Sequence, residues 1–307
     1  MVRFMLGRLL RAFITIIAVV TFAFVVLRMS GDPSQVMLGP DAPQDAVDAF
    51  RHRWGLDQPL WVQYFAYVRS ILTGDFGVSM RDHASALGLV LQRVPATLQL
   101  TLPAMALKLF LGIPAGVYAA LNRDSTTDRA VILLSVLGFT IPSFVMGLLL
   151  VLIFSVMLGV LPSGGQDTWV HGILPTLTLA IGGIGILARF SRSAMIEVLT
   201  QHYVRTASAK GMSWRNVVWR HALPNAALPI VTLVGFMVGS LIAGAVVVES
   251  IFSWPGIGRL LIVSVSNRDL AVVQCILLVI AATMVVSNLL VDLAYGWLDP
   301  RLAARRH

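Results

Sequence analysis

The segment YVRTASAKGMSWRNVVWRHALP, residues 203–224, decides the interpretation of the fold, because it is polar and basic while the residues around it are hydrophobic. Residues 203–210 have a composition compatible with a helix, and Gly211 can adopt the left-handed backbone conformation that ends one. Ser213 is suited to cap a second helix, and Pro224 is expected to stop it. The segment therefore predicts two short helices joined at a glycine.

An apolar stripe runs along the second of these helices. Its members recur at helical spacing and are Trp214, Val217, Val218 and Ala222. A helix pair that carries such a stripe on the aqueous side of a membrane protein is expected to dock on a partner and to bury the stripe in the partner's cleft.

The composition places the rest of the chain in a membrane. Of the 307 residues, 57% are hydrophobic and 12% are charged, and the mean hydropathy is +0.82. The net charge of +8 does not indicate nucleic acid, because the basic residues concentrate at the ends of apolar runs. The single cysteine, Cys275, lies inside an apolar run and excludes an internal disulfide framework.

Six membrane-spanning helices are expected, so that both termini lie on the same side. The first is the run 12–27, which is retained because residues 28–31 offer no small-x-small cleavage site. Pro142 is expected to kink the third run, which is long for one span and short for two. The remaining spans correspond to apolar runs near 97–121, 131–160, 173–188, 226–250 and 270–295.

The distribution of positive charge sets the orientation. Fourteen Lys and Arg residues fall in segments assigned to the cytoplasm and eight fall outside, six of these in a loop too long for the rule to count. The expected organisation is a cytoplasmic N-terminus and first helix at 1–28, an extracytoplasmic loop region at 29–96, a five-helix core at 97–296 that includes the cytoplasmic loop 189–224, and a cytoplasmic tail at 297–307.

The spacing in the basic segment resembles a motif of binding-protein-dependent ABC importers, in which Glu-Ala-Ala is followed after three residues by Gly and after nine more by Ile-x-Leu-Pro. Here Gly211 and Leu223-Pro224 match that pattern. Arg205, Thr206 and His221 depart from it and look like the peptide-importer branch. In that family the loop is the coupling helix, and the resemblance assigns contact with the ATPase to Arg205, Thr206, Ala207, Gly211, Trp214, Val217, Val218, His221, Leu223 and Pro224.

Four further stretches resemble permeases of the dipeptide/oligopeptide importers, namely GDP at 31–33, residues 54–80, ESIFSWPGIGRLL at 249–261 and DLAYGWLDPR at 292–301. The resemblance implies an all-α, type I importer permease in the bacterial inner membrane. It also implies a second permease subunit of similar fold, two ATPase subunits and an extracytoplasmic substrate-binding protein. ATP and Mg would be bound by the partner subunits, and no cofactor is expected in this chain.

One short motif is misleading. SGGQ at 163–166 resembles the signature of ABC ATPase domains, but no Gly-x4-Gly-Lys-Ser/Thr phosphate-binding loop occurs in the sequence. The segment is therefore expected to be a turn, and ATP hydrolysis must occur in a partner. No metal-ligand spacing or catalytic group is evident among the six scattered histidines.

Ionisable residues inside apolar runs are costly and therefore informative. Lys108 lies near the middle of the second run, where it either lines a path and attracts a substrate carboxylate or snorkels and pairs with a neighbour. Glu249, at the outer end of the fifth run, is a candidate for an external gate. Asp292 and Asp299 are expected to have a structural pairing or capping role.

Small residues at four-residue spacing, as at Gly112 and Gly116, predict close helix packing within the chain or with another subunit.

Two other classes of protein stay open. A secondary transporter would need ion-coupling carboxylates at mid-membrane and usually an inverted repeat, and neither is evident. A membrane-embedded enzyme would need paired catalytic groups at a common depth. If the chain belongs to an importer, its substrate is still undecided, because the resemblance extends to transporters of nickel, glutathione and some sugars.

Overall fold

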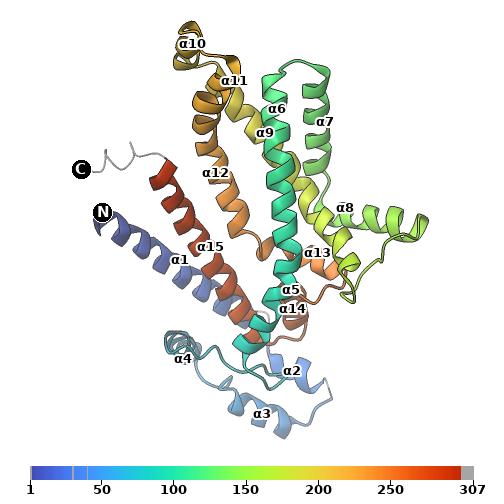
Figure 1. Cartoon of the computed structure of the whole chain (residues 1–307). Helices are drawn as coiled ribbons and strands as arrows, with labels where there is room; N and C mark the ends of the chain where they lie inside the picture. Colours follow the sequence, from blue (N-terminus) through green and yellow to red (C-terminus); the bar gives the residue numbers. More distant parts are fainter. Residues whose placement is uncertain (1, 30, 40, 299–307) are drawn as a thin grey trace. The chain divides into compact units, whose positions relative to one another are not determined.

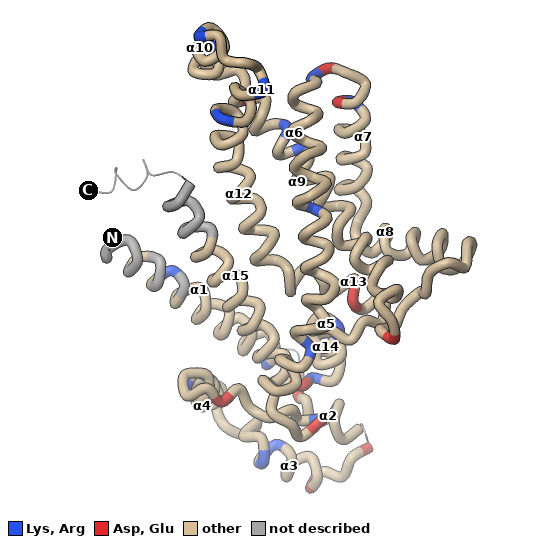
Figure 2. The backbone as a smooth tube through the Cα atoms, viewed as in Figure 1, with Lys and Arg blue, Asp and Glu red and all other residues tan. Residues whose placement is uncertain are grey.

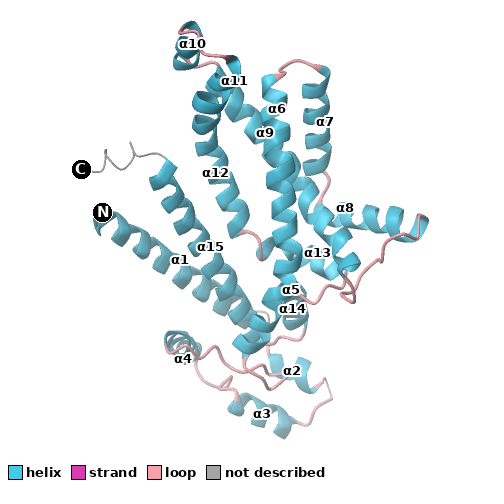
Figure 3. Ribbon diagram, viewed as in Figure 1, coloured by secondary structure: helices cyan, strands magenta, loops and turns pink. Residues whose placement is uncertain are grey.

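The structure is a computed structural model that describes residues 2–29, 31–39 and 41–298, with side chains described except at 2–6, 8, 9, 12 and 291–298. Over these residues the chain is helical, and its one β-type pairing is an isolated bridge between Val78 and Ser85 (Figure 3). The all-helical prediction is confirmed. The chain divides into two compact units, Met1–Thr97 with Pro255–Val285 and Leu98–Trp254 with Val286–His307.

The first unit holds the N-terminal helix and four short helices (Figure 1). A small apolar core is built from Leu27, Met80, Leu270 and Val273. Its helices are α1 (Val2–Met29), α2 (Pro33–Leu38), α3 (Gln44–Arg53), α4 (Leu60–Leu72), α14 (Ile257–Ser266) and the first parts of α5 (Ala86–Leu107) and α15 (Leu270–Leu298).

Hydrogen bonds tie the segment after α1 to distant parts of the same unit. Asp32 caps α2 by accepting from the Ser34 backbone N at 2.9 Å, and its other oxygen accepts from Arg51 Nε at 2.7 Å. Arg268 donates to the backbone oxygen of Asp32 at 3.0 Å. Partial burial opposes ionisation, but the hydrogen bonds from Ser34 and Arg51 hold the pKa of Asp32 below its ordinary value. Asp32 therefore connects the start of α2 to Arg51 of α3 and to Arg268.

A second tie involves the turn before α15. The buried carboxylate of Asp269 accepts from the Ser79 hydroxyl and, at 3.3 Å, from the Met80 backbone N. This bond joins positions separated by about 190 residues in the sequence. The predicted loop region is therefore a folded part of the first unit.

The second unit is organised around α9 (Ile173–Leu199), which packs against α6 (Ile113–Leu121) and α7 (Thr126–Thr140) (Figure 1). Its other helical elements are the π-helical turn Lys108–Gly112 between α5 and α6, α8 (Ser143–Leu150) with the π-helical turn Val151–Met157, the 3-10 turn Trp169–Gly172, α10 (His202–Ala209), α11 (Trp214–Val217), the π-helical turn Val218–Ala222, α12 (Leu223–Gly239), the 3-10 turn Ala243–Ala245 and α13 (Val246–Ile251).

Glycines permit the close packing of α9. A Cβ atom on Gly116 would overlap the carbonyl oxygen of Ala188, and one on Gly185 would lie 2.5 Å from the carbonyl oxygen of Ser135. Neither backbone oxygen can move aside cheaply, so only glycine fits at either place. The small residues of this region serve packing within the chain, which was one of the two predicted uses.

Most of the predicted membrane spans coincide with long apolar helices. Four helices among the described residues are long and apolar enough to cross a membrane, and a bent pair raises the number to five. The bent pair is Thr126–Thr140 with Ser143–Met157, which meet at 100°, so the predicted break at Pro142 is confirmed. The first predicted span falls in α1, where Phe13–Met29 forms a shorter apolar helix.

Two predicted runs differ from the helices that contain them. The helix that contains the second run begins at Ala86, ahead of residue 97, because it extends through Gln92 and Arg93, which hydropathy alone excludes. The fifth predicted run, 226–250, is not one helix, since α12 ends at Gly239 and a turn separates it from α13. Asp299 lies outside the described residues, as does the side chain of Asp292.

A buried ion pair joins α7 to α9, and the sequence analysis missed it. Arg192 donates to Asp128 through Nη2 at 2.7 Å, and Asp128 is only 1% exposed. The same carboxylate accepts from the Asp124 backbone N at 2.9 Å, so it also holds the loop before α7. With both partners present the charge is satisfied, whereas removing one leaves an uncompensated charge.

The two aspartates near the start of α7 give a matched test. Asp128→Asn should lower the free energy of unfolding by about 3 kcal/mol, because it leaves Arg192 without its charge partner. Asp124→Asn should lower it by less than about 0.5 kcal/mol, because the Asp124 side chain is exposed and its ion pair with the exposed Arg123 is a surface pair. Denaturant unfolding of the detergent-purified chain measures both, and equal effects would contradict the assignment.

Candidate functional site

The basic segment forms two helices joined at a glycine, as predicted. We call residues 202–224 the elbow. Its first helix, α10, ends where Gly211 takes a φ of +82°, and the Gly211 backbone N donates to the Ser208 oxygen at 3.0 Å. A Cβ atom on Gly211 would meet nothing within 4 Å, so glycine is favoured there by backbone conformation alone.

The second helix begins as predicted but does not end at Pro224. Ser213 is at the N-cap position, although its side chain accepts no capping hydrogen bond. The helix then continues from Trp214 to Gly239. Proline clashes with the carbonyl four residues earlier in a regular α-helix, and the π-helical turn Val218–Ala222 widens the backbone directly before Pro224. The proline is therefore accommodated inside a continuous helix, and the prediction of a stop is wrong.

Most of the apolar stripe faces inward. Val217 is fully buried with Val204 and Ala207 in a small core between the two helices of the elbow. Val218 and Ala222 are buried in the main core of the second unit. The prediction that Val217 and Val218 enter a partner's cleft is therefore wrong, because the elbow needs these side chains to hold its own helices together.

The outward face of the elbow is basic and aromatic. Trp214 is 55% exposed and Trp219 is 62% exposed. Figure 2 shows Lys and Arg gathered around α10 and α11, and the residues responsible are Arg205, Lys210, Arg215 and Arg220. Sequence reasoning missed Trp219 because it lies off the stripe, although a large aromatic residue at a polar position was a usable signal.

The remaining predicted elbow residues divide between the two faces. Thr206, Gly211 and Pro224 are exposed, whereas His221 and Leu223 are half-buried. The outward face combines large aromatic side chains with cations and a rigid inner core. Such a face has the chemistry of a protein docking surface.

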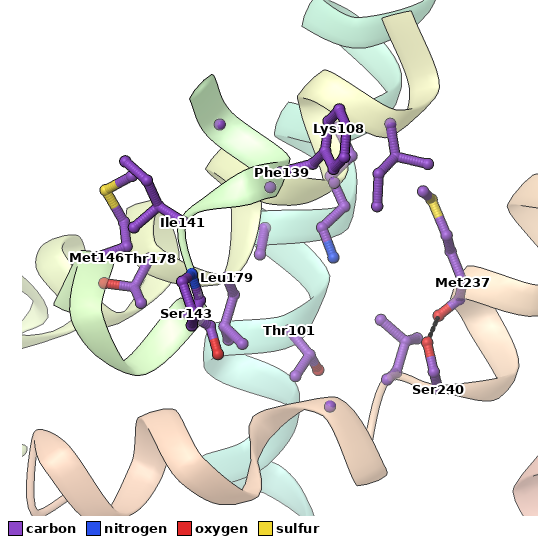
Figure 4. A pocket seen from close by; sticks show the side chains of 18 residues that line it. Thr101, Lys108, Phe139, Ile141, Ser143, Met146, Thr178, Leu179, Met237 and Ser240 are labelled. Carbon is purple, nitrogen blue, oxygen red and sulfur yellow. Dashed lines mark hydrogen bonds between the residues drawn. The ribbon is translucent and has the colours of Figure 1, made fainter. Parts of the chain in front are cut away.

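A cavity of about 340 Å³ lies within the second unit (Figure 4). It is lined by α5, the α7–α8 bend, α9 and the end of α12, and its surface is mainly apolar. Lys108 is in its wall, and its predicted role on a path for the substrate stays a prediction. The hydroxyl-bearing residues of the wall are Thr101, Ser143, Thr178 and Ser240.

Glu249 does not occupy its predicted place. It is fully buried on the short helix α13, which follows the turn after α12, and it is absent from the residues that line the cavity. The fifth predicted run is not continuous up to Glu249, because α12 ends at Gly239 and a turn separates it from α13. Its role in a gate stays a prediction.

The SGGQ segment forms an irregular connection, as predicted. The Gly165 backbone N donates to the Phe252 oxygen at 2.9 Å, and Gln166 donates to Gln99 at 2.9 Å. A Cβ atom on Gly164 would lie 2.6 Å from the Phe252 oxygen. These glycines therefore allow the chain to pass close to the end of α13.

Comparison with known proteins decides the family. The model of the binding-protein-dependent transport system inner membrane component matches residues 112–304, and the model of that component's N-terminal region matches residues 1–101. The chain belongs to this family. Its resemblance to ABC importer permeases is thereby confirmed, and it is a multi-pass inner-membrane permease subunit of an ABC importer.

The curated relatives match over nearly their whole length. The chain is 42% identical over 304 residues to the glutathione transport system permease protein GsiC of Salmonella choleraesuis (strain SC-B67), covering 98% of this chain and 99% of that protein. It is 40% identical over 304 residues to the protein of the same name from Escherichia coli (strain K12), with the same coverage.

A solved structure supports the fold independently. An inward-facing structure of the MetNI methionine ABC transporter superposes with a TM-score of 0.58 at 18% sequence identity. The match covers 69% of this chain and 96% of that chain. It shows that the chain has the type I permease fold.

The glycine of the elbow yields a second prediction. Gly211→Val should abolish most substrate uptake, because a β-branched residue cannot adopt a φ of +82° without strain of about 1–3 kcal/mol. Gly211→Asn should retain most of the uptake, because asparagine tolerates this conformation. Uptake by the assembled importer, corrected for the amount of chain in the membrane, measures both. Wild-type uptake by the valine variant would show that the elbow does not need this turn.

Proposed function

We propose that the chain forms half of the translocation pathway of an ATP-driven importer of small peptides, with glutathione as the first candidate. The supporting observation is the 42% identity to a glutathione permease over 98% of this chain. Glutathione is itself a tripeptide, so this candidate agrees with the peptide-importer motifs at 31–33 and 54–80.

The exposed face of the elbow is the proposed contact with the ATPase subunits. Trp214 and Trp219 would serve as apolar anchors, and Arg205 and the other cations of this face would meet acidic groups around them. Val217, Val218 and Ala207 take part indirectly, because they fix the orientation of that face. ATP and Mg would be held by two such subunits.

Movement of the elbow can reach the cavity through packed helices. Val218 and Ala222 lie in one core with Leu187 and Met195 of α9, and α9 and α12 both line the cavity. When the ATPase subunits close, the elbow would therefore shift helices that surround the solute. A second permease subunit of similar fold would supply the other wall of the path.

The folded loop region of the first unit is the proposed surface for an extracytoplasmic substrate-binding protein. It carries exposed acidic residues at Asp45 and Asp57. A cysteine at Asp45 should react with an impermeant thiol reagent added to intact cells, whereas a cysteine at Arg205 of the elbow should react only after the cells are opened. Cys275 is buried and should stay silent in both variants. The opposite labelling pattern would invert the topology.

Reconstitution of the importer into liposomes tests which solute it transports. Proteoliposomes containing the permease pair, the ATPase subunits and the binding protein should accumulate glutathione when ATP is supplied, and should not do so with a non-hydrolysable analogue. Uptake of nickel ions in its place would assign another solute to the same machinery. Uptake driven by an ion gradient without ATP would show that the proposed function is wrong.

A further inference from the structure

The Lys108 ammonium points into the cavity without a partner. The side chain leaves the helix at the first residue of the π-helical turn Lys108–Gly112 and extends toward the space between α9 and α12 (Figure 4). Among the described residues, no hydrogen bond or ion pair holds its nitrogen. No acidic residue lines the cavity. The positive charge is therefore uncompensated by the wall that surrounds it.

A glycine makes the room in which the lysine lies. A Cβ atom on Gly183 of α9 would overlap Cε of Lys108 and lie 2.6 Å from its Cδ. The lysine stem thus lies directly on the α9 backbone, and its ammonium is held over the cavity. A Cβ atom on the adjacent Gly182 would make only ordinary contact, 3.4 Å from the Gly138 oxygen.

Placing a cation within a membrane-spanning helix costs free energy, and such residues usually line a substrate path or contact a charged partner. The cavity supplies no anion, but its wall offers hydroxyl groups, among them those of Ser143 and Ser240. The Ser240 hydroxyl already donates to the Met237 oxygen at 3.0 Å, which leaves its oxygen lone pairs available as acceptors. The site as a whole therefore favours a solute that brings a negative charge together with polar N–H groups.

We propose that the Lys108 ammonium, held in place by Gly183, binds a carboxylate of the solute as it passes through this cavity. This inference rests on the proposed function, because a small peptide carries such a carboxylate and its amide N–H groups suit the hydroxyl acceptors. One ammonium on a flexible stem gives a weak contact that imposes no fixed bidentate geometry on the carboxylate. A permease needs such a contact because a solute that binds too tightly is not released.

The test uses the complete importer with its own binding protein and a matched pair of solutes, glutathione and its glycyl monoethyl ester, which lacks one carboxylate. Lys108→Met should lower glutathione uptake about tenfold, as expected when a hydrogen bond to a charged group is lost. Lys108→Arg should retain most of it. The preference of the importer for glutathione over the ester should fall by a similar factor in Lys108→Met, and the contribution of the shared binding protein cancels in this comparison.

Two glycine variants test whether the position of the Lys108 side chain matters in addition to its charge. Gly183→Ala should displace the flexible lysine and lower uptake, whereas Gly182→Ala should leave it unchanged. Combining Gly183→Ala with Lys108→Met should cause no further loss beyond that of Lys108→Met alone, because both act through the same ammonium.

The outcomes distinguish this inference from the function on which it rests. No ATP-driven uptake of glutathione by the wild-type importer would contradict the proposed function. Normal wild-type uptake that is unchanged in Lys108→Met would overturn the carboxylate site and leave the function intact. Uptake lost equally for both solutes, together with lower thermal stability of the complex, would assign Lys108 a structural role and would also overturn the proposal.

Discussion

The close approach of α9 to its neighbours is the constraint on which the second unit depends. Gly116 on α6 and Gly185 on α9 lie against backbone oxygens of the facing helices, where no side chain fits. This spacing brings Arg192 within reach of the buried Asp128 on α7. It also places the Gly182–Gly183 pair where the Lys108 stem can lie across the helix. Tight glycine packing, the buried ion pair and the cavity are thus consequences of the position of one helix.

The same helix connects the cavity to the elbow. Leu187 and Met195 of α9 share a core with Val218 and Ala222, while the elbow's own core is closed by Val217. Buried side chains thus join the elbow to α9, and Gly182, Gly183 and Ile186 of the same helix line the cavity. Because packed interiors transmit displacement with little compression, the proposed ATPase contact on the outer face would move α9 and α12 together. This arrangement explains why the apolar stripe of the elbow is turned inward.

The sequence predicted elements and family well, and tertiary contacts poorly. Gly211, the break at Pro142 and the irregular SGGQ connection depend on local backbone chemistry, so each could be predicted. Pro224 was misinterpreted because a π-helical turn relieved the clash that usually ends a helix. The direction of the Val217–Val218 stripe, the Asp128–Arg192 pair and the contact of Gly183 with Lys108 require knowledge of which helices meet. Periodicity shows that a helix has an apolar face, but it does not show whether that face meets the chain itself or a partner.

The function of the permease depends on the proposed contact between the outer face of the elbow and the ATPase. The most direct measurement is site-specific photo-crosslinking in the assembled importer, with p-benzoyl-phenylalanine replacing Trp219 of the elbow or Trp169, which is 80% exposed and lies before α9. Both replacements exchange one exposed aromatic side chain for another. We expect an adduct with the ATPase subunit from position 219 and none from position 169. An ATPase adduct from position 169, with none from position 219, would contradict it.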